Sequence, residues 1–158
     1  MPAGYSGTPT AKKLGIKPGQ DVIVLGAPVD YATLVDGLPK DLTWRTSLGR
    51  RADLVHAFVT KAAVLERRIA DLRAAIAPEG SLWVSWPKKA SKVPTDVTED
   101  VIRRVALANG LVDVKVCAID ATWSGLKLVI PIAQRGKTEA QPVSPGGASG
   151  QGNACGIP

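Results

Sequence analysis

A short basic segment holds the residues of this sequence whose types and spacing best fit ligand binding. In "SWPKKASKVPTDVTED" (85–100), three lysines fall within five positions at the end of an apolar run. The candidate binding residues are Trp86, Lys88, Lys89, Ser91 and Lys92. Ammonium and hydroxyl groups attract an acidic ligand, and a terminal tryptophan can stack on a planar one. The alternatives are an exposed charged loop and a tryptophan packed in the core.

A second candidate lies in the turn of "DVIVLGAPVDY" (21–31). Its members are Gly26, Ala27 and Pro28. A glycine directly after a buried strand allows the backbone to approach a ligand closely. In open α/β sheets the carboxyl ends of the strands meet at one edge, so we expect this turn and the basic segment to converge on one ligand site.

The remaining reactive residue types are sparse. His56 is the only histidine, and Cys117 and Cys155 lie far apart. A structural zinc site needs about four closely spaced ligands, so we expect no metal site. Within apolar strands, His56 is expected to be a hydrogen-bonded core residue and Cys117 inert packing, and no nucleophilic triad is indicated.

The hydrophobic pattern predicts the elements that carry these residues. Strands are expected over 21–26, 42–47, 53–59, 81–86, 111–120 and 126–132, and helices over 28–35, 61–77 and 97–108. Alternating strands and helices predict a mostly parallel sheet with helices on both faces. The last two strands are joined too tightly for a parallel crossover, so they form an antiparallel hairpin.

Local details of these elements can also be predicted. Thr60 can cap the second helix, and Asp96 with Glu99 resembles the start of the third. The segment 78–80 ("PEG") is expected to end the second helix before the fourth strand. In the hairpin, Trp123 is expected to be exposed. Strict alternation places one set of residues on one face of the sheet. That set is Val112, Val114, Val116 and Ala118.

Length and composition set the broad class. The 158 residues favour one Rossmann-like three-layer α/β domain over 1–132, and the Gly/Ser/Pro-rich segment 133–158 predicts a disordered tail. The net charge of +6 permits weak attraction to anions, but the excess is modest, and nucleic acid is not an expected partner. No apolar run has the length of a signal peptide or a membrane anchor. Two isolated cysteines are typical of a protein in a reducing compartment. We therefore expect a cytoplasmic location without membrane partners.

The order of elements resembles an S-adenosylmethionine-dependent methyltransferase domain with one strand–helix unit missing after "LTWRTS". The stretches that carry the resemblance are "KPGQDVIVLGA" (17–27), "ADLVHAFV" (52–59), "LRAAIAPEGSLWVSWPK" (72–88) and the hairpin 111–132. At finer grain, residues 2–132 resemble a family of small uncharacterised actinobacterial proteins that carries a domain-of-unknown-function label. The resemblance implies a fold and no reaction.

Two departures from that pattern decide the functional hypothesis. The turn "LGAPVDY" has one glycine, and the second strand ends in "WRTSLGRR", where Arg45 replaces the acid that would hold ribose hydroxyls. Both count against S-adenosylmethionine as cofactor. We therefore expect a non-catalytic or regulatory protein that binds an acidic small molecule or a protein partner through 86–95. The alternatives are a divergent methyltransferase and an assembly protein whose Trp123 hairpin forms a homo-oligomer.

Overall fold

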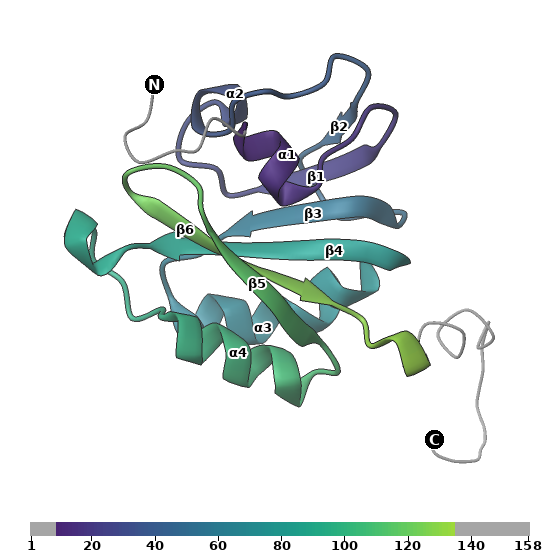
Figure 1. Ribbon diagram of the computed structural model, residues 1–158. Coiled ribbons are helices and arrows are strands. Elements are labelled where there is room, and N and C mark those ends of the chain that lie inside the picture. The colour runs from purple at the N-terminus through teal and green to yellow at the C-terminus, as the bar shows by residue number, and fades with distance from the viewer. Residues whose placement is uncertain (1–8, 135–158) are drawn as a thin grey trace, which may run out of the picture.

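A six-stranded sheet forms the centre of residues 9–134, the part of the chain that the computed structural model describes (Figure 1). The strand order is β2-β1-β3-β4-β6-β5. The first four strands pair in parallel, and β6 is antiparallel to both neighbours. The elements are α1 Thr10–Leu14, β1 Asp21–Leu25, α2 Tyr31–Leu34, β2 Thr43–Arg45, β3 Ala52–Phe58, α3 Ala62–Ala74, β4 Ile76–Pro87, the 3₁₀ turn η1 Lys89–Ser91, α4 Glu99–Ala108, β5 Val112–Ala118 and β6 Trp123–Val129. The predicted mostly parallel α/β fold with a C-terminal antiparallel pair is confirmed.

The helices make two further layers on the sheet. In Figure 1, α1 and α2 lie on one face, and α3 and α4 lie on the other. Each face has its own apolar core. Trp83 packs in the core under α1, whereas Trp86, three residues later, packs in the core of the α3–α4 side. Both tryptophans are buried, so core packing accounts for Trp86 at the end of β4.

The first predicted helix is much shorter than expected. The pattern predicted residues 28–35, but α2 contains only Tyr31–Leu34. Val35 returns to extended backbone, with φ −122° and ψ 107°, which ends the helix after one turn. Pro28 therefore lies in the turn that precedes the helix and not in its first turn.

The segment 78–80 lies inside a strand and not between the helix and the strand, so its predicted role in ending the helix was wrong. Strand β4 begins at Ile76, directly after α3 ends at Ala74. The register shifts here, because Ala52 pairs with Ile76 while Leu54 pairs with Ser81. The irregularity depends on Gly80, since a Cβ there would lie 2.8 Å from the Asp53 carbonyl oxygen. The extra residues form a bulge that periodicity alone does not distinguish from a turn.

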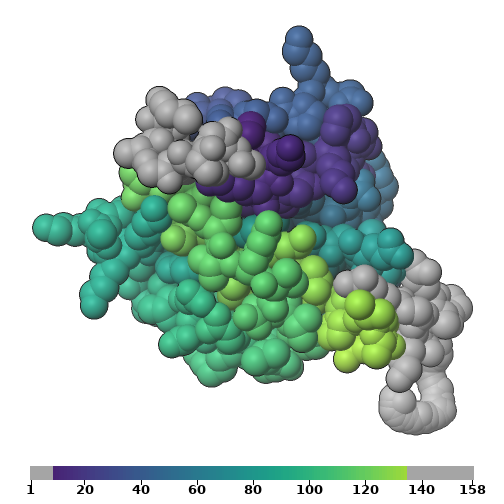
Figure 2. Space-filling model, in the orientation of Figure 1, coloured from purple at the N-terminus to yellow at the C-terminus, as the bar shows by residue number. Residues whose placement is uncertain are grey.

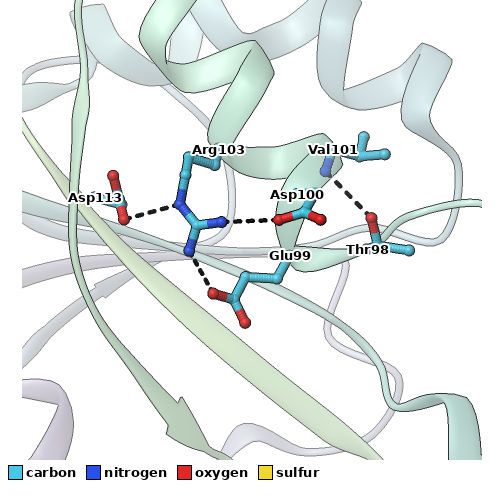
Figure 3. Close-up of polar contacts among 6 residues, drawn as sticks. All are labelled: Thr98, Glu99, Asp100, Val101, Arg103 and Asp113. Atoms are coloured by element: carbon cyan, nitrogen blue, oxygen red, sulfur yellow. Dashed lines mark hydrogen bonds and ion pairs between the residues drawn. The ribbon is translucent and has the colours of Figure 1, made fainter.

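Two helix starts use other residues than predicted. Thr98, not Asp96, caps α4 by accepting a hydrogen bond from the Val101 N–H at 3.2 Å (Figure 3). The Asp96 carboxylate instead accepts from the Ala62 N–H at 2.8 Å, in the first turn of α3. Thr60 does not cap α3; its carbonyl accepts the Thr95 hydroxyl. A cap supplied from 34 residues away has no local sequence signature.

We expect Asp96→Ala to lower the free energy of unfolding by about 1 kcal/mol, the usual cost of losing a helix cap. Glu66→Ala on the same helix is the control, because its ion pair with Arg104 is long, at 3.9 Å, and exposed. Urea unfolding of both variants measures the difference. Equal stabilities of the two variants would contradict the capping role of Asp96.

Arg103 connects α4 to the edge strand β5 (Figure 3). Its guanidinium donates to Glu99 and Asp100 on its own helix and to Asp113 on β5. The hydrogen bond from Arg103 holds the pKa of the Asp113 carboxyl below its usual range. Asp113 therefore faces α4.

The hairpin does not alternate as predicted. The register of β5 shifts between Asp113 and Lys115, which leaves Val114 as an extra residue. Lys115 then pairs with Lys127, and Val116 pairs with Leu126 on the opposite face. After a one-residue bulge, every later residue of the strand points to the opposite face of the sheet. The prediction that Val112, Val114, Val116 and Ala118 share one face was therefore wrong.

Trp123 is buried, which corrects its predicted exposure. It is 8% exposed, and its ring meets that of Phe58 edge-on at 5.2 Å. The last strand of the chain, β6, lies inside the sheet, and β5 forms the edge of the sheet on this side.

No helix within residues 9–134 has the length and apolar character that crossing a membrane requires. The predicted disordered tail falls almost wholly on 135–158, outside the described residues.

Candidate functional site

The turn after β1 lies where the strand order reverses. From β1 the chain passes to β2 on one side and then to β3 on the other, so the reversal falls between β1 and β3. Gly26 follows β1 with φ +73°. A Cβ at this position would lie 3.0 Å from the carbonyl oxygen of Phe58 at the end of β3. Glycine is therefore required both by the backbone angle and by the close approach of the two strand ends.

A cavity of about 440 Å³ opens beside this turn. Its lining includes Gly26, Ala27, Asp30, Tyr31, Trp44, Arg45 and Thr46. A second cavity of about 360 Å³ adjoins it and shares Asp30, Tyr31 and Trp44. Both volumes lie in the range of small-ligand sites, and the carboxyl edge of the sheet is where such folds bind ligands.

The shared wall combines two aromatic rings with one carboxylate. The rings of Tyr31 and Trp44 lie 5.6 Å apart at 69° and form a corner, and Trp44 is 43% exposed. The Asp30 carboxylate is exposed and makes no hydrogen bond or ion pair with another residue of 9–134. This wall suits a planar ring, ligand hydroxyl groups that donate to Asp30, or a cationic group.

Arg45 also lines the first cavity, but its guanidinium is paired with a carboxylate. Its Nε and Nη2 donate to the two carboxylate oxygens of Asp21, each at 3.1 Å. Arg50 adds an ion pair to Asp21 at 3.2 Å. Because Asp21 begins β1, the guanidinium of Arg45 is held toward the amino end of the sheet. The position of Arg45 at the end of β2 therefore does not by itself count against a ligand with ribose hydroxyls at this edge.

A buried row of hydrogen-bonded side chains fixes the ring of Tyr31 on the side away from the cavities. The Tyr31 hydroxyl lies 2.6 Å from His56 Nδ1, and His56 Nε2 lies 2.6 Å from the Ser85 hydroxyl. His56 and Ser85 are fully buried, and burial lowers the pKa of His56 to about 3 and raises that of Tyr31. His56 is thus neutral and donates to one hydroxyl while it accepts from the other. The prediction of a hydrogen-bonded core histidine is confirmed.

The predicted site residues fall into two separate places. Gly26 and Ala27 line the first cavity, and Pro28 follows in the same exposed turn. The basic segment leaves the end of β4 and projects from the sheet at η1 (Figure 1). There Lys88 is half-buried and Lys89 and Lys92 are exposed. The Ser91 hydroxyl donates to the Lys88 carbonyl. Neither cavity includes a residue of this segment, and its binding role stays a prediction.

Sequence reasoning missed the residues that form the shared wall. Asp30 and Tyr31 were read as part of a longer helix, and Trp44 as part of a weak strand. The available signal was Trp44, a large aromatic residue in an otherwise polar segment. In the described part of the chain, no three metal-ligating side chains gather into a possible metal site.

Several solved structures with a similar fold are named as methyltransferases. No protein-family model matches the chain, and no match to a curated protein is found. A S-adenosylmethionine-dependent methyltransferase from Aquifex aeolicus has a TM-score of 0.54 at 13% identity and covers 76% of this chain and 87% of its own. Magnesium protoporphyrin IX methyltransferase from Synechocystis with bound S-adenosylmethionine has a TM-score of 0.52 at 15% identity, covering 72% and 71%. At such identities the likeness establishes a Rossmann-like methyltransferase-type fold.

These neighbours correct the functional hypothesis. A non-catalytic or regulatory protein that acts through 86–95 is contradicted, because the structures that share this fold favour the methyltransferase alternative. The cavity agrees with the correction, since its lining includes the Asp30 carboxylate and no lysine, and the guanidinium of Arg45 in its lining is paired with Asp21. The actinobacterial resemblance, the cytoplasmic location and a homo-oligomer stay predictions.

Proposed function

We propose that this protein is an S-adenosylmethionine-dependent methyltransferase that binds its cofactor in the cavity beside Gly26. The observation that carries the proposal is the Gly26 turn, which leaves no room for a side chain against the Phe58 carbonyl at the end of β3 and lies directly beside a cavity of about 440 Å³. The turn lies at the reversal of strand order, the preferred ligand position of open α/β sheets. Its structural neighbours include a methyltransferase with bound S-adenosylmethionine.

The chemistry of the cavity wall fits this cofactor. S-adenosylmethionine combines a planar base, two ribose hydroxyls and a positively charged sulfur. Trp44 offers an exposed ring face for the base, and Asp30 offers an unpaired carboxylate for the hydroxyls or the charge. The end of β2 carries no acidic residue that could hold the ribose hydroxyls, and Asp30 at the start of α2 supplies a carboxylate in its place.

In this proposal each residue of the chain has a binding or positioning role. Bound S-adenosylmethionine supplies a methyl group that its sulfonium activates for transfer. Gly26 allows the backbone to approach the ligand, and Asp30 accepts its hydroxyl protons in hydrogen bonds. Tyr31 forms the wall between the two cavities, and His56 fixes its ring by holding the hydroxyl. Holding the reacting groups in a fixed geometry is a main source of rate in such transfers.

Calorimetric titration with S-adenosylmethionine tests the proposal. We expect the parent protein to bind it and Asp30→Asn to weaken the affinity at least tenfold, the usual effect of losing a hydrogen bond to a charged group. Glu79→Gln is the matched control, because Glu79 is exposed near the amino end of β4. The absence of heat at millimolar cofactor, or an equal effect of both substitutions, would refute the proposed site.

A further inference from the structure

Three lysines from separate parts of the chain lie together on the α1 face of the sheet. The register places Lys115 of β5 directly opposite Lys127 of β6. Lys127 in turn pairs with Trp83 of β4, whose indole nitrogen donates to the carbonyl of Leu14 at 2.9 Å. This bond brings the end of α1, and with it Lys17, beside the pair. We call Lys17, Lys115 and Lys127 the lysine face.

Within residues 9–134, no ion pair compensates the positive charge of this face. Burial and the charges of Lys115 and Lys17 lower the pKa of Lys127. Among residues 9–134, none of the three forms an ion pair with a carboxylate. Asp113 is held by Arg103 on the other face of the sheet, and Asp120 accepts from backbone N–H groups of its own turn. Like charges directly opposite each other destabilise a strand pair, so the arrangement opposes folding.

Protection of an exposed edge does not explain the lysine face. Lysines on edge strands prevent unwanted pairing between sheets, which would account for Lys115 on β5. Lys127, however, lies on β6, between β4 and β5 in the interior of the sheet. Lys17 lies outside the strands, in the connection that follows α1. A binding role accounts for all three.

We propose that the lysine face binds nucleic acid through its backbone phosphates. Figure 2 shows β5 and β6 at the front of the molecule, directly below the α1 segment. None of the cavities described above includes these lysines, so an extended anion fits better than a small one. Protein interfaces are depleted in lysine and need aromatic anchors, and the tryptophan in this row, Trp83, is fully buried. Lysines that contact phosphates alone bind without sequence preference.

Fluorescence anisotropy with a mixed-sequence single-stranded RNA of about 20 nucleotides tests this proposal, since that length exceeds typical site sizes. We expect binding by the full chain that weakens as KCl rises. The double variant Lys115→Gln/Lys127→Gln should reduce the slope of log affinity against log salt by about 1.4, which is about 0.7 per lost phosphate contact. It should also raise the melting temperature, because the repulsion between the opposed lysines is removed.

The control is Lys88→Gln/Lys89→Gln, which removes the same charge from the basic segment. Equal loss of RNA binding in both double variants would overturn the proposal in favour of a nonspecific charge effect. Polyglutamate that binds the parent as tightly as RNA would also overturn it, and would indicate an acidic protein partner. S-adenosylmethionine binding should be unchanged in Lys115→Gln/Lys127→Gln, so the failure of either proposal can be distinguished from the failure of the other.

Discussion

Replacing His56 with leucine is expected to lower the free energy of unfolding by about 3 kcal/mol. The change leaves the hydroxyls of Tyr31 and Ser85 buried without their partner, and each unsatisfied group costs about 1–3 kcal/mol. Guanidinium unfolding followed by tryptophan fluorescence measures the loss. A variant within about 0.5 kcal/mol of the parent, the scatter of ordinary surface substitutions, would contradict the role of this buried row.

A triple variant separates the lost hydrogen bonds from a simple packing defect. His56→Leu combined with Tyr31→Phe and Ser85→Ala removes every polar member of the row. Replacing all hydrogen-bonding partners by apolar groups changes the free energy of unfolding little, whereas removing only one partner lowers it. The triple variant should therefore be more stable than His56→Leu alone. A triple variant that is less stable would show that packing, and not unpaired polarity, causes the loss.

The same residue gives the protein a defined pH dependence. The pKa of His56 is about 3 in the folded protein, whereas an unfolded chain has the ordinary value of 6.5. Between these values only the unfolded state binds the proton, so the free energy of unfolding decreases as the pH falls below about 6.5. Above that pH, His56 contributes no slope. The difference in stability between the parent and His56→Leu should shrink from pH 7 to pH 5.

Gly26→Ala is expected to abolish cofactor binding at the proposed site and to destabilise the protein. Alanine at φ +73° costs about 1–2 kcal/mol from the backbone angle alone. Its Cβ would also approach the Phe58 carbonyl oxygen to 3.0 Å, so the turn must move away from β3. Movement of the turn at the strand ends changes the cavity wall. We therefore expect the affinity for S-adenosylmethionine to fall more than tenfold.

Gly19→Ala is the matched control for this experiment. Gly19 has nearly the same backbone angle, φ +83°, but nothing lies within 4 Å of a Cβ at that position. Both variants should lose similar stability from the backbone angle, and only Gly26→Ala should lose cofactor binding as measured by calorimetry. Normal binding by Gly26→Ala would place the ligand away from the β1 turn and contradict the proposed function.

Much of the fold could be predicted because it depends on local patterns. The branched apolar run before Gly26 predicted β1, and the spacing of Leu65, Ile69 and Leu72 predicted the buried face of α3. Trp83 and Trp86, three residues apart in β4, lie on opposite faces of the sheet. These features follow from the two-residue and 3.6-residue repeats of strands and helices, which every short stretch of sequence displays.

The candidate site depended on contacts that no short stretch displays. The cavity wall unites Asp30 and Tyr31 of one segment with Trp44 of another, and the guanidinium of Arg45, which also lines the cavity, is paired with Asp21. The lysine face exists because a single extra residue in β5 brings Lys115 opposite Lys127. By itself, the sequence determined the order of the elements, the glycine after β1 and the buried histidine. Only the tertiary structure decided which side chains meet, because strand register and bulges are set by pairing between distant segments.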